Sequence, residues 1–205
     1  MLKTFYSQNF QGAISGQFIF IDNDCLAHIY DHAILLKELT GNFGLKNLYI
    51  HPFVEFEFLR NTPVLEIKLN KQKFIESPLF AVISQKLYLE HLPNFITNAL
   101  LLSKIYVQEK YCGASSFVDL VLAGMLMAAK NKGVMLTGNR KDFPACVFDT
   151  LATINLEFDQ ENHKVIYVLA FNKERFEKCN DMLKEADYKQ AKKLITEINQ
   201  QKQKS

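Results

Sequence analysis

Residues 17–26 have the sequence QFIFIDNDCL, in which a short apolar run leads directly into an Asp-Asn-Asp triplet. An apolar run of this length, rich in Phe and Ile and ending at polar residues, predicts a buried parallel strand over residues 17–21. Asp24 is placed to serve as the N-cap of a helix, because apolar residues then repeat at helical spacing as far as residues 40–42. A strand followed by a helix predicts the opening of an α/β fold.

The same order of elements recurs further along the chain. A second strand is predicted over residues 48–50, with a helix starting just after it because Pro52 suits a first helical turn. Residues 116–132 are apolar almost all round, which predicts a buried helix packed on a sheet. Gly133 ends that helix, and residues 134–137 predict a third strand. Because parallel strands that finish in polar loops share one edge, a functional site is expected there.

Two other parts of the chain carry weaker patterns. Residues 63–110 are mostly helical in pattern, with stops at Pro78 and Pro93, so we expect three or four helices there. Two β-rich segments separated by residues 159–163 predict a hairpin. Residues 172–205 predict a lysine-rich helix with one apolar stripe.

These elements predict a three-layer α/β/α fold with a mainly parallel central sheet, to which the hairpin and the last helix are added. With 205 residues, the chain has room for one domain and an extension. We expect the domain to occupy residues 1–145 and the extension, residues 146–205, to pack on it.

Composition narrows the class of protein. Hydrophobic residues make up 48% and charged residues 22%, which predicts a folded domain. The net charge of +2 excludes a histone-like polycation but allows a local phosphate-binding patch. The sequence shows no apolar leader and no run of about 18 apolar residues, so we expect a cytoplasmic protein without membrane contact. The four cysteines lie far apart, which predicts reduced, buried thiols.

Two aspartates stand where structural needs alone do not explain them. Asp22 lies at the carboxyl end of the first predicted strand, where α/β folds place ligand-binding groups. Asp119 lies among apolar residues on a helix with little polar face, and an ionised carboxylate buried without a partner is destabilising. A cation would offset that cost. Backbone amides of the first helical turn would also stabilise the Asp119 charge, because Asp119 is three residues beyond Ser116.

Two further segments bring charged groups to the same region. Glu55 and Glu57 lie in one predicted helix, where about 200° separates them, so only one can point at the sheet edge. The segment TGNRKDF, residues 137–143, contributes an amide and two cations, Arg140 and Lys141. Such a segment is an ordinary solvated turn when alone, but beside a cluster of carboxylates it would attract phosphates.

The segments IFIDNDCL, YIHPFVEFEFLR, SFVDLVLAGMLMAAKNKG and VMLTGNRKDFP follow one another in this order. In order and spacing they resemble the PIN domain family, the fold of the toxin nucleases of VapBC-type toxin-antitoxin pairs. The resemblance covers about residues 17–144. It implies that the site consists of Asp22, Glu57, Asp119 and Asn139, the first three of them as metal ligands. Glu55 stays an alternative to Glu57.

The implied activity is metal-dependent endoribonuclease cleavage of RNA, with Mg²⁺ or Mn²⁺ bound by carboxylate oxygens. Arg140, Lys141 and Arg60 are the candidates to bind substrate phosphates. The resemblance extends to a toxin role, with an antitoxin as protein partner and a homodimer as the assembly. The chain departs from the family pattern in two places: Asn23 and Asp24 replace the usual Thr-Asn pair, and the fourth position is an amide.

Other interpretations stay open. The segment IFIDNDCL also resembles haloacid-dehalogenase-like phosphatases, in which Asp22 would be the nucleophile and Asp24 the acid/base. However, no later predicted strand ends in the acids that would hold that family's Mg²⁺. A third possibility is a PIN-like module that binds protein or RNA without catalysis. His28 and His32, one helical turn apart and near Asp24, would form either a transition-metal site or a solvated face.

Overall fold

A seven-stranded sheet forms the centre of the computed structural model, which describes residues 2–60, 62–83, 85–108, 115–158, 162–184, 192–193, 195–198 and 200. The strands are β1 (Lys3–Tyr6), β2 (Phe18–Ile21), β3 (Leu48–Ile50), β4 (Phe80–Val82), β5 (Gly133–Thr137), β6 (Phe148–Glu157) and β7 (His163–Phe171). The helices are α1 (Phe10–Ile14), α2 (Asn23–Asp31), α3 (Ala33–Gly41), α4 (Pro52–Arg60), α5 (Leu65–Ile75), α6 (Gln85–Gln108), α7 (Phe117–Ala129) and α8 (Lys173–Lys184). Short 3₁₀ turns occupy Lys130–Lys132 and Arg140–Asp142.

The order of strands is β1-β6-β7-β5-β2-β3-β4. The predicted α/β class is confirmed, and β2, β3 and β5 lie where the sequence places them. The mainly parallel sheet is not confirmed, because three of the six strand pairings described are antiparallel. The reason is that the hairpin β6-β7 continues the central sheet beside β5, and strands joined by a short turn pair antiparallel. The proposed division at residue 145 therefore falls within one continuous sheet.

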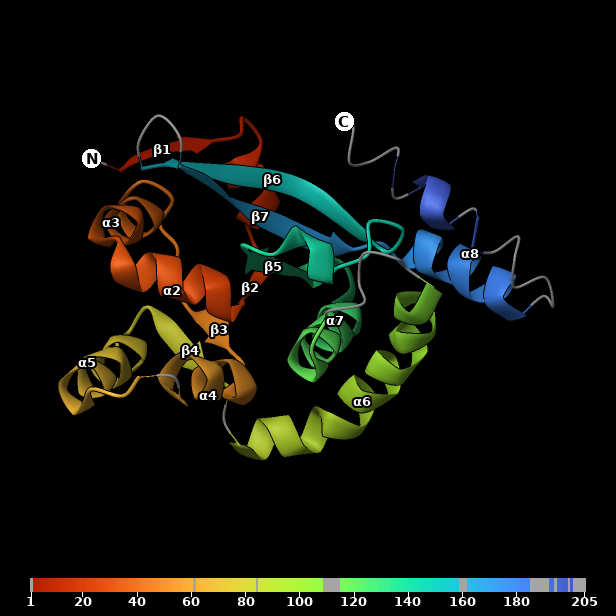
Figure 1. Ribbon diagram of the computed structural model, residues 1–205, viewed down its shortest axis with the longest axis horizontal. Coiled ribbons are helices and arrows are strands. Elements are labelled where there is room, and N and C mark those ends of the chain that lie inside the picture. The colour runs from red at the N-terminus through yellow and green to blue at the C-terminus, as the bar shows by residue number, and fades with distance from the viewer. Residues whose placement is uncertain are drawn as a thin grey trace.

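The parallel part of the sheet, β5-β2-β3-β4, positions the site. Figure 1 shows α2 to α5 on one side of these strands and α6 and α7 on the other. This arrangement follows from right-handed crossovers that run first in one direction along the sheet and then back to β5. The five residues of β5 are all buried, so the strand lies at the centre of the core.

The segment between α4 and α7 differs from the prediction of three or four helices over residues 63–110. Two helices are present, α5 and α6, with the short strand β4 between them. β4 has only three residues, which are too few to show the alternation of a strand in the sequence. It forms a strand because it pairs with β3. Pro93 does not end a helix but lies within α6, which bends (Figure 1). Proline removes one helical hydrogen bond and so bends a helix that tertiary packing maintains.

The helix predicted to start at Asp24 is two helices, α2 and α3, separated at His32. Its N-cap is Asp22 and not Asp24. Nothing in the sequence marks the break, since neither Gly nor Pro is present there. The ring of His32 packs on Phe158, with the two centroids 4.9 Å apart, so a tertiary contact accompanies the change of direction.

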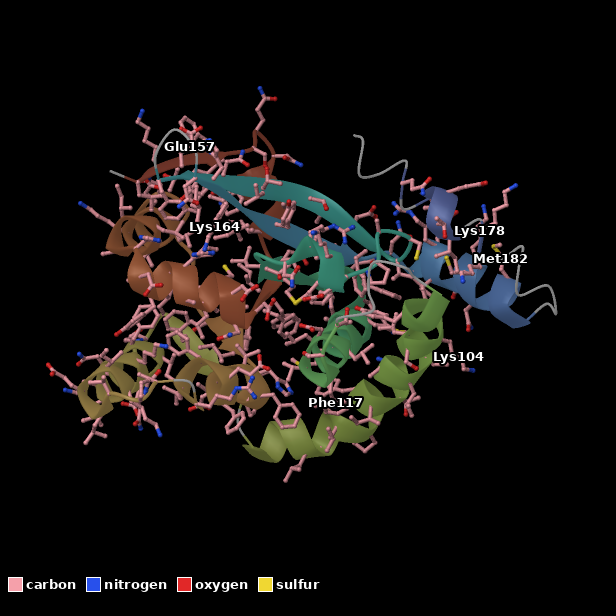
Figure 2. All side chains as sticks on the ribbon, in the orientation of Figure 1. Lys104, Phe117, Glu157, Lys164, Lys178 and Met182 are labelled. Carbon is pink, nitrogen blue, oxygen red and sulfur yellow. The ribbon has the colours of Figure 1, made fainter. Side chains whose placement is uncertain are left out.

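The last helix begins at Lys173, close to the predicted start, and α8 lies beside α6 (Figure 1). Figure 2 shows Lys104 of α6 at the same end of the molecule as Lys178 of α8. Most of the predicted helix beyond residue 184, the middle of the hairpin turn and Cys112 lie outside the described residues. The other three cysteines are buried free thiols, as predicted. In the part of the chain that is described, no helix is both long and apolar enough to span a bilayer.

Candidate active site

Asp22 lies where the carboxyl ends of β2 and β5 meet. Its backbone amide donates to the carbonyl of Leu136 on β5 (3.0 Å), which continues the strand pairing by one residue. Its carboxylate accepts hydrogen bonds from the hydroxyl of Thr137 (2.7 Å) and from the amide of Asn23 at the start of α2 (2.6 Å). The side chain is 6% exposed. Strand, helix start and neighbouring strand together fix its position.

Burial raises the pKa of Asp22 to about 7, even though the hydrogen bond from Thr137 opposes the change. The charges of Asp119 and Asp24 raise the pKa further, and the amide of Asn23 lowers it. The pKa of Asp22 therefore depends on the charge of Asp119, which lies nearly a hundred positions away in the chain. α7 also packs against β5, the strand that pairs with β2.

Asp24 is an exposed residue in the first turn of α2, next to the loop that follows β5. A Cβ atom added to Gly138 would come within 3.3 Å of the Cβ of Asp24. The close approach explains why glycine follows Thr137. Asp24 therefore lies beside this loop, and it is not the N-cap that the sequence predicts.

Glu57 is linked by charge to the other acids. Burial raises the pKa of Glu57, the neighbouring Arg60 lowers it, and the charges of Asp119 and Asp24 raise it. A guanidinium nitrogen of Arg60 lies 3.8 Å from the Glu57 carboxylate. Glu55 lies about 200° around α4 from Glu57 and stays the alternative prediction.

Asp119 combines two roles in the first turn of α7. It forms a capping box with Ser116: the Ser116 amide donates to the Asp119 carboxylate (2.6 Å), and the Asp119 amide donates to the Ser116 hydroxyl (3.2 Å). Burial raises its pKa, the two contacts with Ser116 lower it, and the charge of Asp24 raises it. The capping interpretation is therefore correct. The same carboxylate also contributes charge to the site, and it is partly exposed because α7 becomes fully buried only beyond its first turn.

Asp142 is the site acid that sequence reasoning missed. Its carboxylate accepts a hydrogen bond from the side-chain amide of Asn139 and a longer one from the hydroxyl of Ser115 (3.4 Å). Burial raises the pKa of Asp142 to about 6, and the charges of Asp119 and then Asp24 add to this change. Asn139 therefore holds Asp142 in place. The signal in the sequence was the Asp-Phe pair that ends the segment TGNRKDF.

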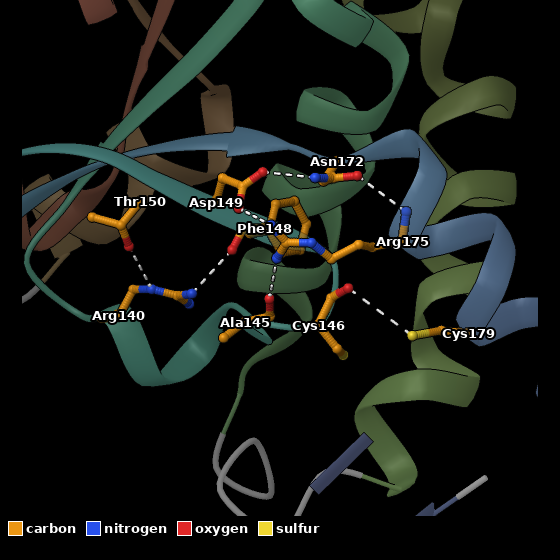
Figure 3. Close-up of polar contacts among 9 residues, drawn as sticks. All are labelled: Arg140, Ala145, Cys146, Phe148, Asp149, Thr150, Asn172, Arg175 and Cys179. Carbon is orange, nitrogen blue, oxygen red and sulfur yellow. Dashed lines mark hydrogen bonds and ion pairs between the residues drawn. The ribbon is translucent and has the colours of Figure 1, made fainter. Parts of the chain in front are cut away.

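Arg140 connects the loop that follows β5, residues 138–143 (the site loop), to the hairpin β6-β7 (Figure 3). Its guanidinium donates to the Thr150 hydroxyl (3.1 Å), to the Phe148 carbonyl (3.0 Å) and to the Phe143 carbonyl. With these three acceptors engaged, Arg140 holds the loop in position, and its assignment to substrate phosphates stays a prediction. Lys141, the next residue, is exposed.

Neither family models nor curated proteins nor solved structures match this chain. The resemblance to the PIN domain family therefore stays a prediction based on the order of the four segments. Function has to be inferred from the site itself.

The donor set suits a hard divalent cation. The site acids, Asp22, Asp24, Glu57, Asp119 and Asp142, offer only carboxylate oxygens, the ligands preferred by Mg²⁺ and Mn²⁺. No three of the acidic, His or Cys side chains in the described ranges are close enough to share one ion as they stand. Three of the carboxylates accept hydrogen bonds instead, from Thr137, Ser116 and Asn139.

The histidine pair predicted as an alternative metal site is less suitable. The rings of His28 and His32 are stacked with centroids 6.3 Å apart. Burial lowers the pKa of His28, and the charge of Lys164 lowers it further. The charges of Asp24 and Asp31 raise it, and no third His, Cys, Asp or Glu among the described residues completes a site with the pair.

Proposed function

We propose that the chain is a metal-dependent endoribonuclease whose site is the group of five acids around the end of β2. One observation carries the proposal: burial raises the pKa of four acids from four separate segments, Asp22, Glu57, Asp119 and Asp142, and the charge of Asp24 raises the pKa of each of them further. Partly buried carboxylates that repel one another are stabilised by a divalent cation. Such a cluster costs stability without an ion, so a purely structural role does not explain it.

Asp22, Glu57 and Asp119 would hold the ion, with Asp24 and Asp142 beside them. When bound, Mg²⁺ or Mn²⁺ lowers the pKa of a water molecule and stabilises the leaving oxygen of a phosphodiester. The chain's own residues position this chemistry. Thr137 and Asn23 fix the Asp22 carboxylate, and Asn139 fixes Asp142.

Lys141 and Arg60 are the residues we assign to the substrate phosphates. Both are exposed. Lys141 directly precedes Asp142, and Arg60 lies three residues after Glu57. Arg140 is left out because its guanidinium already has three protein acceptors. A phosphatase with Asp22 as nucleophile stays the alternative prediction, and hydrolysis of small phosphomonoesters that is lost in Asp22→Asn but kept in Asp119→Ala would favour it. The toxin role, the antitoxin, the homodimer and the cytoplasmic location stay predictions.

Two glutamates on one helix provide a matched test. We expect Glu57→Gln to slow Mn²⁺-dependent cleavage of a fluorescent RNA by at least about 100-fold, because it removes a ligand. Glu55→Gln, prepared in the same way, should cleave as the wild type does. Circular dichroism would check that both variants are folded. Equal cleavage by the two variants, or no metal-dependent cleavage by the wild type, would refute the proposed function.

A further inference from the structure

Two exposed phenylalanines flank the acids. The chain has 17 phenylalanines, all within the described ranges, and the two most exposed are Phe56 (59%) and Phe117 (58%). Phe56 precedes Glu57 on α4, and Phe117 lies two residues before Asp119 on α7. Large apolar side chains gathered beside a charged site indicate a binding surface more often than chance exposure does.

The phenylalanine on α7 meets a partner from α4. The rings of Phe117 and Phe53 have centroids 6.1 Å apart and an interplanar angle of 55°. Phe53 lies four residues before Glu57, so both side chains project from the same face of α4. The contact between Phe53 and Phe117 therefore joins α4 and α7 beside the two acids that these helices contribute. Figure 2 marks Phe117 at the α7 end of this contact.

The ring of Phe53 packs against the buried, neutral ring of His51. His51 is 1% exposed and its ring centroid lies 5.1 Å from that of Phe53. The amide of Phe53 donates to Nδ1 of His51 (3.0 Å), which fixes the start of α4. His51 and Phe53 thus give Phe117 a rigid support, and the large exposed fraction of Phe117 leaves much of its side chain open.

A cation accompanies the aromatic side chains. The guanidinium of Arg60 lies 5.7 Å from the Phe56 ring centroid and 3.8 Å from the Glu57 carboxylate. Aromatic rings alternating with cations are the pattern by which proteins bind unpaired nucleotides, since every base has a π-face and every linkage a phosphate. A protein partner would be expected to meet a wider aliphatic surface with fewer charges in it.

We propose that Phe117, supported by Phe53, stacks an unpaired nucleobase next to the phosphate that we assign to Arg60. This inference rests on the proposed nuclease function and adds to it the residue that positions the substrate. RNA whose bases are paired would not offer a free base face, so the site would act on single-stranded segments. Phe117 is accordingly a positioning residue and takes no part in the chemical step.

Binding, and not cleavage, tests this inference, so its failure can be told apart from failure of the nuclease proposal. The Glu57→Gln protein would be mixed with an eight-nucleotide RNA carrying 2-aminopurine, and fluorescence quenching and anisotropy would be recorded with Mn²⁺. Adding Phe117→Ala should weaken binding about tenfold and abolish the quenching. Phe117→Tyr should keep both, because the aromatic face remains. Phe18→Ala is the matched control, since Phe18 is 48% exposed and lies at the opposite end of β2 from Asp22.

Four results would overturn the inference. The first is equal RNA binding by Phe117→Ala and its parent protein. The second is full binding by Phe117→Leu, which would show a general apolar contact without stacking. The third is a change in oligomeric state caused by Phe117→Ala, which would show that the ring belongs to a protein interface. The fourth is absence of RNA binding by the parent protein and the wild type.

Discussion

Replacing Asp22 with asparagine should stabilise the metal-free protein at alkaline pH, although it removes a group that the proposed reaction needs. Burial raises the pKa of Asp22 from its ordinary value of 3.8 to about 7. At a pH between these two pKa values, the Asp22 carboxyl of the folded protein keeps a proton that the unfolded chain has released. Stability therefore falls as the pH rises through this interval. The stabilisation from removing the charge should appear in the same interval.

The size of the effect follows from the same values. The increase in the pKa of Asp22 from 3.8 to about 7 corresponds to a loss of about 4 kcal/mol in the free energy of unfolding at alkaline pH. This is an upper limit, because asparagine must make new hydrogen bonds with Thr137 and Asn23. We expect Asp22→Asn to raise the free energy of unfolding by about 2–4 kcal/mol at pH 8 and by much less at pH 4.5. In a chain of this size that corresponds to about 5–10 °C in the midpoint of thermal unfolding.

Urea unfolding followed by circular dichroism at pH 4.5, 6 and 8 with a chelator present would measure this difference. Addition of Mn²⁺ at pH 8 should then stabilise the wild type more than Asp22→Asn, since the folded wild type binds the ion through this carboxylate. A difference that does not grow from pH 4.5 to pH 8 would show that Asp22 is not a buried, destabilising charge. Equal stabilisation of both proteins by Mn²⁺ would remove Asp22 from the ion site.

Two further predictions concern packing around the site. Arg140→Ala should lower the free energy of unfolding by about 2–3 kcal/mol, because backbone carbonyls lose a charged donor. Lys68→Ala, at an exposed position of α5, should change it by less than about 0.5 kcal/mol. Similar urea midpoints for the two variants would contradict the assigned role of Arg140. Gly124→Ala should cost about 1–3 kcal/mol, because its Cβ would lie 2.6 Å from the Phe95 carbonyl on α6. Gly12→Ala, with nothing within 4 Å of the new Cβ, should be neutral or stabilising in the same thermal unfolding assay. A Gly124→Ala protein as stable as Gly12→Ala would show that α6 and α7 do not approach as closely as described.

The sequence predicts the elements that carry the site because their patterns are strong and local. Each of β2, β3 and β5 is a short apolar run that ends at polar residues. Pro52 marks the start of α4, and Ser116 marks the start of α7. These signals suffice to bring Asp22 and Thr137 to neighbouring strand ends, where the hydrogen bond between them is observed.

Elements defined by distant contacts were not predictable. β4 has three residues and exists through its pairing with β3, and β1 becomes a strand by pairing with β6. Asp142 lies in a charged turn, where the Asp-Phe pair is a weak signal because most acids in such turns are solvated. The role of Arg140 depends on carbonyls that β6 and the site loop bring to it only after folding.

The position of β7 in the sheet has a consequence for biosynthesis. β5 pairs with β7, so the inner strand of the sheet stays without one neighbour until residue 171 has been synthesised. β1 waits in the same way for β6, since Lys3 pairs with Glu157. A nascent chain on the ribosome therefore carries an unpaired, strongly apolar strand. Chaperones should engage ribosome-bound chains that stop after β5 more strongly than chains that extend past β7.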